Sequence, residues 1–195
     1  MENVRLLLMD IEKIADNKES IIRLLSEEDI NQSEKYIKES DKLLHIGSTY
    51  LKKKYVDGTI SIDSHGKPKS NRCHFNISHS HDVVGVAITA NHEVGLDIET
   101  KEELNDDVKK YCLSDDEINQ LGKDSAIEYF VSKESLAKAE GTGLPNDMKS
   151  VPALPLDGKV EYKGKKYYRH KIFDESHCIS ITLEGADFEI QTEEL

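Results

Sequence analysis

The most regular hydrophobic pattern in the chain lies between Ser125 and Glu140 and predicts an amphipathic helix. At 100° per residue, one stripe of this helix carries three apolar and two charged residues: Ile127, Phe130, Val131, Glu134 and Lys138. Asp124 or Ser125 can cap its start, and Gly141 can end it. The stripe therefore places a carboxylate and an ammonium group on the helix face that is expected to meet the core.

Glu134 and Lys138 permit two interpretations. An ion pair at i and i+4 is common on solvated helix faces, where it contributes only a few tenths of a kcal/mol. Here the pair shares the apolar stripe, and a charge buried without a partner is costly. The shared stripe favours a functional site on this helix.

Alternating apolar and polar residues predict strands on both sides of residue 92. Before it, the predicted strands are 4–9, 59–62, 74–79 and 82–90; after it, they are 93–99, 158–162, 166–173, 178–183 and 188–192. Further helices are expected near 19–25, 26–39, 40–55, 104–112 and 115–121, two of them opening with capping boxes, Ser26 with Asp29 and Ser114 with Glu117. Helices and strands mix without regular βα alternation, which predicts the α+β class.

The pattern also suggests two parts within one compact unit, an amino-terminal half at 1–92 and a carboxy-terminal half at 93–195. A chain of 195 residues is long enough for such an arrangement to bury a core. A chain of two halves favours a monomer. Gly47 interrupts the 40–55 helix at an energetic cost, which indicates close packing there.

Composition limits the classes of partner and compartment. No stretch is long and apolar enough to cross a bilayer, and the start has no secretory cleavage pattern. Three scattered cysteines are typical of reduced thiols in a cytoplasmic protein. The net charge of −12 argues against binding to nucleic acid or to an anionic membrane surface.

One basic strip interrupts this acidic chain. It consists of Lys159, Lys163, Lys165, Lys166, Arg169 and Lys171, opposed only by Glu161. Such a strip suits an acidic or phosphorylated partner. The alternative is a solvated hairpin edge, where lysines discourage pairing with other strands.

The stretch EVGLDIE places two carboxylates together. On a strand, Val94, Leu96 and Ile98 face one way, while Asp97 and Glu99 face the other. Two carboxylates this close repel unless a cation lies between them. With a third oxygen ligand from Glu134, they describe a Mg²⁺ site that water and substrate phosphate oxygens would complete. The alternative is an exposed strand face with two acidic residues.

Three histidines, His74, His79 and His81, lie close together in the chain without a cysteine or carboxylate in zinc-ligand spacing. A structural zinc site needs four defined ligands, so this pattern argues against zinc. His79 is better suited to a phosphate contact beside Ser78, unless it continues the apolar face of Phe75 and Ile77 into the core.

Taken together, three stretches in fixed order resemble the Sfp-type 4′-phosphopantetheinyl transferases. They are GKP…FNISHS at 66–80, GLDIE at 95–99 and FVSKESLAKAEG at 130–141. The resemblance implies a fold of two pseudosymmetric α+β halves with coenzyme A, the substrate, in the cleft between them. Its implied metal ligands for Mg²⁺ are Asp97, Glu99 and Glu134. Its implied coenzyme A contacts are Lys67, Pro68, Ser78, His79 and Lys138, with Lys67 beside the nucleotide.

The resemblance also implies a reaction, in which a carrier-protein serine attacks the coenzyme A diphosphate and adenosine 3′,5′-bisphosphate leaves. Glu134, or a water that it orients, would take the proton, and Lys138 would assist at the phosphates. The partner would be an acyl or peptidyl carrier protein, docked with help from Lys165 and Lys166. In this chain, Leu43 stands where the family usually has an arginine, for which Lys42 or His45 would substitute, and residues 26–34 are acidic where contacts to the 3′-phosphate are expected.

Two other interpretations compete with this one. A non-catalytic module could keep the fold and bind only carrier protein or nucleotide. The smaller holo-[acyl-carrier-protein] synthase type carries its GxDI motif near the amino terminus and assembles as a trimer, whereas here about half the chain precedes Gly95.

Overall fold

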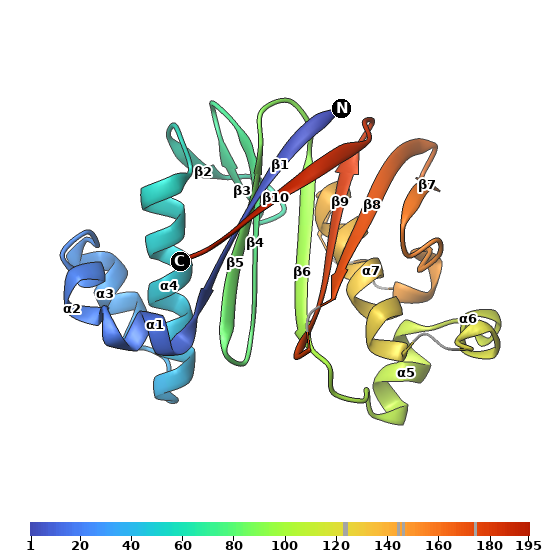
Figure 1. Ribbon diagram of the computed structural model, residues 1–195, viewed down its shortest axis with the longest axis horizontal. Helices are drawn as coiled ribbons and strands as arrows, with labels where there is room; N and C mark the ends of the chain where they lie inside the picture. The colour runs from blue at the N-terminus through green and yellow to red at the C-terminus, as the bar shows by residue number, and fades with distance from the viewer. Residues whose placement is uncertain (123–124, 144, 146, 174) are drawn as a thin grey trace.

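The computed structural model describes residues 1–122, 125–143, 145, 147–173 and 175–195. Two four-stranded sheets and a small hairpin carry the fold (Figure 1). The first sheet has the order β10-β1-β5-β4, with strands β1 (Glu2–Asp10), β4 (His74–Ser80), β5 (Val83–Thr89) and β10 (Phe188–Glu194). The second has the order β6-β9-β8-β7, with strands β6 (Val94–Thr100), β7 (Gly158–Tyr162), β8 (Lys165–Phe173) and β9 (His177–Glu184). The hairpin pairs β2 (Ile60–Ile62) with β3 (Pro68–Ser70).

The helices flank the sheets. Between β1 and β2 the chain forms the helices α1 (Ile11–Asp16), α2 (Lys18–Ile22), α3 (Glu27–Ser33) and α4 (Glu39–Tyr55). Three follow β6, namely α5 (Asp106–Cys112), α6 (Asp115–Gln120) and α7 (Ala126–Glu140), and a 3₁₀ turn spans Met148–Ser150. In Figure 1, α4 lies beside the first sheet and α7 beside the second.

The described residues form three large hydrophobic clusters and a small one at Ile127, Val131 and Cys178. On β1, Leu7 and Met9 face α4, whereas Val4 and Leu6 face the second sheet. Leu96 and Ile98 of β6 join Val4 and Leu6 in the cluster between the sheets. The third cluster lies between α7, α5, the 148–156 segment and the β7–β8 hairpin. The two sheets therefore share one core.

Helix α7 is buried on most of its circumference, because β6, β9 and the 148–156 segment surround it. Gly95 of β6 permits this packing, since a Cβ at that position would overlap the backbone of Ser135 and Ala139. Gly141 ends the helix in the left-handed conformation at φ 82°. Ser125 is the N-cap residue, but its side chain makes no capping hydrogen bond, and Asp124 lies outside the described residues.

The two sheets meet edge to edge without a backbone ladder. Three side chains of β4 instead bond the free N–H groups of β6: Leu96 N–H donates to Asn76 Oδ1 at 2.9 Å, Ile98 N–H to Ser78 Oγ at 3.3 Å, and Thr100 N–H to Ser80 Oγ at 3.3 Å. Buried backbone groups need such partners. The polar face of HFNISHS is therefore the seam between the sheets.

The last described strand crosses back to the first sheet. β10 runs parallel to β1 and forms the sheet edge, with Val4 opposite Ile190 (Figure 1). Leu195 N–H adds a further hydrogen bond to the Leu8 carbonyl oxygen at 2.9 Å. Residues 188–194 thus lie in the sheet that otherwise consists of strands before residue 92.

The α+β class is confirmed, and so are the predicted strands. Both capping boxes form, and Gly47 packs directly against Ile14 of α1. Three details of the secondary structure were wrong. Helix α1 and the short strand β3 were not expected, and the helix expected at 26–39 ends at Ser33. The boundary between halves at residue 92 stays a prediction.

Candidate active site

Strand β6 presents Asp97 and Glu99 to the side of the second sheet that α7 covers. Asp97 is 3% exposed, and its Oδ1 atom lies 2.5 Å from the Lys138 ammonium nitrogen on α7. The predicted strand face, which carries Asp97, therefore meets the predicted helix face, which carries Lys138. The alternative of an ordinary Glu134–Lys138 ion pair on the helix surface is wrong, since Lys138 pairs with Asp97.

Ser78 joins three elements at this point. Its hydroxyl donates to Asp97 Oδ1 at 3.0 Å and accepts hydrogen bonds from Lys138 Nζ and the Ile98 N–H group, each at 3.3 Å. The side chains of Ser78 and Asp97 are buried, whereas that of Lys138 is partly exposed. Ser78 thereby fixes the relative positions of β4, β6 and α7 at the site.

The other two carboxylates lie nearby. Glu99 Oε2 accepts a hydrogen bond from the Ser80 hydroxyl at 2.8 Å, and Glu134 is 9% exposed on α7. Burial raises the pKa of Asp97 and of Glu99, and burial together with the charges of Asp97 and Glu99 raises the pKa of Glu134 to about 7. Three carboxylates whose charged forms are disfavoured together form an electrostatically strained group.

The chemistry of these donors fits Mg²⁺, which prefers carboxylate oxygens. Asp97 Oδ2 is buried and has no hydrogen-bond partner among the described residues, so one ligand atom is available. Within the same residues, no three His, Cys, Asp or Glu side chains already form a group that could hold an ion. Asp97, Glu99 and Glu134 would hold the metal only after moving closer together.

A cavity of about 200 Å³ adjoins this cluster. Lys67, Pro68, Asn76 and Lys138 line it, together with the α7 end at Gly141. Strands β3 and β4 and helix α7 thus border one opening. Of the residues expected to contact coenzyme A, Lys67, Pro68 and Lys138 line the cavity.

His79 lies on the opposite face of β4 from Ser78, because side chains alternate along the strand. It is exposed, so it does not extend the buried core. Crowding by the surrounding protein and the nearby charge of Lys138 lower the pKa of His79. Its electrostatic influence therefore reaches the cluster even though no direct hydrogen bond to it is observed among the described residues.

The amino-terminal residues that could replace the family's arginine have partners of their own. Lys42 forms an ion pair with Glu34 at 2.8 Å. The ring of His45 lies 5.3 Å from that of Tyr36. His45 also lies close enough to His79 for their charges to interact.

The basic strip lies on the β7–β8 hairpin at the edge of the second sheet, as the alternative interpretation had it, and not all of its charges are at the surface. Arg169 is fully buried, and its guanidinium group donates to the carbonyl oxygens of Pro152, Ala153 and Pro155. Most of the lysines are paired with acidic residues: Lys159 with Glu161, Lys163 with Glu140, Lys165 with Glu184 and Lys171 with Glu128.

Sequence reasoning missed the role of Lys133, which is fully buried inside α7. Its ammonium group contacts Glu117 Oε2 at 2.8 Å and donates to the Met148 and Val151 carbonyl oxygens at 3.1 and 2.6 Å. The residue lies off the apolar stripe and so has the pattern of a solvated lysine. No local signal would have indicated that α6 and the 148–151 turn cover this face.

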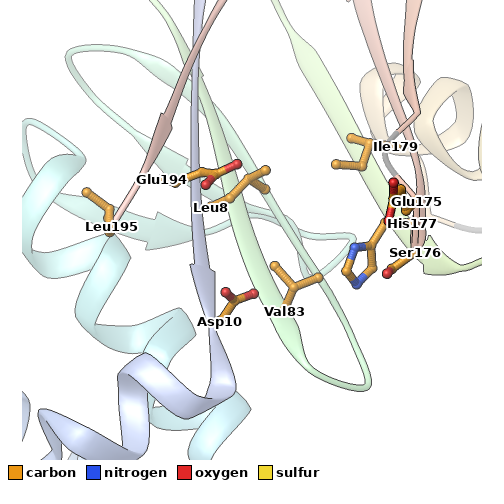
Figure 2. A pocket seen from close by; sticks show the side chains of 9 residues that line it. All are labelled: Leu8, Asp10, Val83, Glu175, Ser176, His177, Ile179, Glu194 and Leu195. Carbon is orange, nitrogen blue, oxygen red and sulfur yellow. The ribbon is translucent and has the colours of Figure 1, made fainter.

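A second cavity, of about 320 Å³, lies elsewhere on the molecule (Figure 2). His177 and Ile179 of β9 border it on one side, and Leu8 and Asp10 of β1 border it on the other (Figure 2). Ile179 pairs with Ile98 and so points away from the face that carries Asp97. This cavity contains none of the predicted site residues.

Comparison with known proteins shows the family of this chain. A family model described as the 4′-phosphopantetheinyl transferase superfamily matches residues 93–191, just over half of the chain. The match includes β6 and α7, which carry Asp97, Glu99, Glu134 and Lys138. The chain belongs to the 4′-phosphopantetheinyl transferase superfamily, whose general activity is the transfer of phosphopantetheine.

A comparison with curated proteins finds no match. Among the described residues, no helix has both the length and the apolar character that a membrane crossing requires.

Proposed function

We propose that this protein transfers the 4′-phosphopantetheine group of coenzyme A to a serine of an acyl or peptidyl carrier protein, in a reaction that depends on Mg²⁺. The serine oxygen forms a bond to the phosphorus that bears pantetheine, and the bridging P–O bond of the diphosphate breaks. Adenosine 3′,5′-bisphosphate leaves, and the serine proton passes to a base.

The observation that carries the proposal is the joint placement of Ser78, Asp97 and Lys138 beside the 200 Å³ cavity. Phosphoryl transfer requires positioning and charge stabilisation more than covalent catalysis. An ammonium group, a hydroxyl and a carboxylate with an unpaired oxygen supply those functions at one point. This placement joins elements that are far apart in the sequence.

Each side chain then has a role that its surroundings permit. Lys138 lines the cavity and is 27% exposed, so its ammonium group can contact a phosphate oxygen there. Glu134, or a water that it orients, can accept the serine proton. Mg²⁺ held by Asp97, Glu99 and Glu134 would neutralise charge on the phosphate oxygens.

The carrier protein is expected to approach from the side of β8. Lys166 is exposed, and Lys165 is half-exposed while paired with Glu184 at 3.1 Å. Carrier proteins of this class are acidic, so these lysines offer complementary charge. Reversal of both charges should raise the KM for the carrier and alter its salt dependence. An unchanged KM would remove these lysines from the proposed docking surface.

The deciding experiment is intact-mass spectrometry of an apo carrier protein incubated with this protein, coenzyme A and Mg²⁺. A gain of one phosphopantetheine that is absent with Asp97→Ala supports the proposal. Glu161→Ala, which removes an exposed carboxylate on β7, serves as the matched control and should retain activity. No gain across acyl and peptidyl carriers, with coenzyme A still bound, would overturn transfer and indicate a non-catalytic binding module.

A further inference from the structure

The ammonium group of Lys67 has three oxygen partners. It contacts Glu93 Oε2 at 2.8 Å and donates to the carbonyl oxygens of Lys138 at 2.8 Å and Val94 at 3.4 Å. A lysine ammonium has three N–H donors, so these contacts use all of them. Only 9% of the Lys67 side chain is exposed. The stem of Lys67 lines the cavity, but its charge has no donor left for a ligand.

The contact with the Lys138 carbonyl closes the end of α7. The last four carbonyl groups of a helix have no partner within the helix. In α7, Gly141 N–H donates to the Ala137 carbonyl at 3.0 Å, and Lys67 supplies the partner for the next one, at Lys138. A positive charge at a helix carboxyl end also interacts favourably with the helix dipole.

Lys138 is also the residue whose side chain reaches Asp97. Its carbonyl is held by Lys67 at 2.8 Å, while its ammonium group lies 2.5 Å from Asp97 Oδ1. A shift of the helix end would therefore move the backbone from which this ammonium group extends. The position of the Lys138 ammonium group therefore depends on the hydrogen bond from Lys67 to the Lys138 carbonyl oxygen.

Local structure holds Lys67 in this place from the other side. Asp63 Oδ1 accepts hydrogen bonds from the N–H groups of His65 and Lys67, and Gly66 takes a left-handed φ of 84° in the same turn. Glu93 anchors the ammonium group and also pairs with the exposed Lys69 at 3.3 Å. The β2–β3 hairpin is thus attached to the far end of α7.

We propose that Lys67 is a positioning residue, which fixes the carboxyl end of α7 and thereby holds Lys138 against Asp97, rather than a direct contact to coenzyme A. The inference rests on the proposed function for its effect on catalysis. Glu93 has a part in the same role, because its carboxylate anchors the Lys67 ammonium group.

The test that needs no activity is amide hydrogen exchange of the ligand-free protein. Lys67→Met should accelerate exchange about tenfold or more at residues 139–141, while residues 127–131 at the start of α7 stay unchanged. Glu93→Gln should give the same local pattern, since it removes the anchor. The matched control is Lys69→Met, which removes a different lysine that also pairs with Glu93. Its amide exchange rates at 139–141 should equal those of the wild type. Unchanged exchange at 139–141 in both Lys67→Met and Glu93→Gln would overturn the inference.

Transfer kinetics supply the second test. Lys67→Met and Glu93→Gln should each lower kcat, and the double variant should lose little more than either single variant. Lys67→Arg should restore part of the rate, because its charge can still reach the helix end. A loss confined to the KM for coenzyme A in Lys67→Met, absent from Glu93→Gln, would show a direct ligand contact. If the wild-type protein transfers nothing, the proposed function fails, and the exchange pattern still decides the role of Lys67.

Discussion

The Ser78 hydroxyl donates a hydrogen bond to Asp97 Oδ1 at 3.0 Å, although the two residues belong to different sheets. The same hydroxyl accepts the N–H of Ile98, which is one of the bonds that close the seam. The seam and the site are therefore one set of interactions. Substitutions along the seam should affect stability and site geometry together.

Asn76→Leu tests the seam away from the carboxylates. It removes the acceptor of the buried Leu96 N–H, so the free energy of unfolding should fall by about 1–3 kcal/mol. Urea unfolding followed by circular dichroism measures the change. Asn3→Leu, at an exposed position of β1, is the control and should shift stability by less than about 0.5 kcal/mol. Equal effects at both positions would contradict the role of the seam.

Glu134→Gln should lower the transfer rate by about 10²–10⁴-fold, since it removes the proposed proton acceptor. The fold should persist, because the amide has nearly the same shape and removes a charge from a position that is 9% exposed. The rate is measured by carrier mass, and the fold by thermal unfolding. Glu128→Gln on the same helix, whose carboxylate pairs with Lys171 at 3.7 Å, should keep its activity. Wild-type rates in Glu134→Gln would remove it from the mechanism.

Gly95→Ala should destabilise the protein by about 1–3 kcal/mol or more, since overpacking forces α7 away from β6. Thermal unfolding measures this cost. Gly143→Ala is the comparison: its surroundings are open, so only the left-handed backbone at φ 86° is penalised, by about 1 kcal/mol. A smaller effect at Gly95 than at Gly143 would show that the helix can move without cost.

The sequence predicted the strands well, because period-two alternation is a local signal. Helix α1 was missed because its six residues offer only Ile11 and Ile14 as large apolar positions, and β3 because it is three residues long and polar. The residues of the site were proposed from the motifs, but their contacts were not. Lys138 pairs with Asp97 and not Glu134, because β6 packs along α7 through Gly95, which is a long-range relationship.

The burial of Arg169 also depends on long-range packing that the local sequence does not indicate. Its position in a lysine-rich segment indicates a solvated charge, yet burial is complete and lowers its pKa to about 9. Arg169→Met should lower the free energy of unfolding by about 3 kcal/mol or more, as three carbonyl oxygens lose their donors. Chemical denaturation measures it, with exposed Lys166→Met as control. A neutral Arg169→Met would mean that water replaces the guanidinium group.

Asp29 predicts how stability responds to acid. Burial alone would raise its pKa, but the Lys53 ammonium group and the hydrogen bonds from Ser26 outweigh burial and hold the pKa at about 2. A depressed pKa stabilises the folded state above the unfolded value of about 4, and this contribution is lost as pH falls toward 2.

Comparison with Asp29→Asn isolates that contribution. At pH 6 the variant should be less stable than the wild type by at most about 1 kcal/mol, because solvent screens an ion pair near the surface. Near pH 2 the difference should vanish, because Asp29 becomes protonated. Urea unfolding across this range measures it. A difference that does not depend on pH would assign the effect to the capping box and not to the charge.

The position of β10 has a consequence for how the protein is made. One neighbour of β1 in the first sheet is a strand that the ribosome adds some 180 residues later, at 188–194. During synthesis, β1 can already pair with β5, but its other edge keeps unpaired backbone groups until the second sheet has been translated. Completion of the amino-terminal sheet is therefore a late event of biosynthesis, and the nascent chain carries an open strand edge for most of that time.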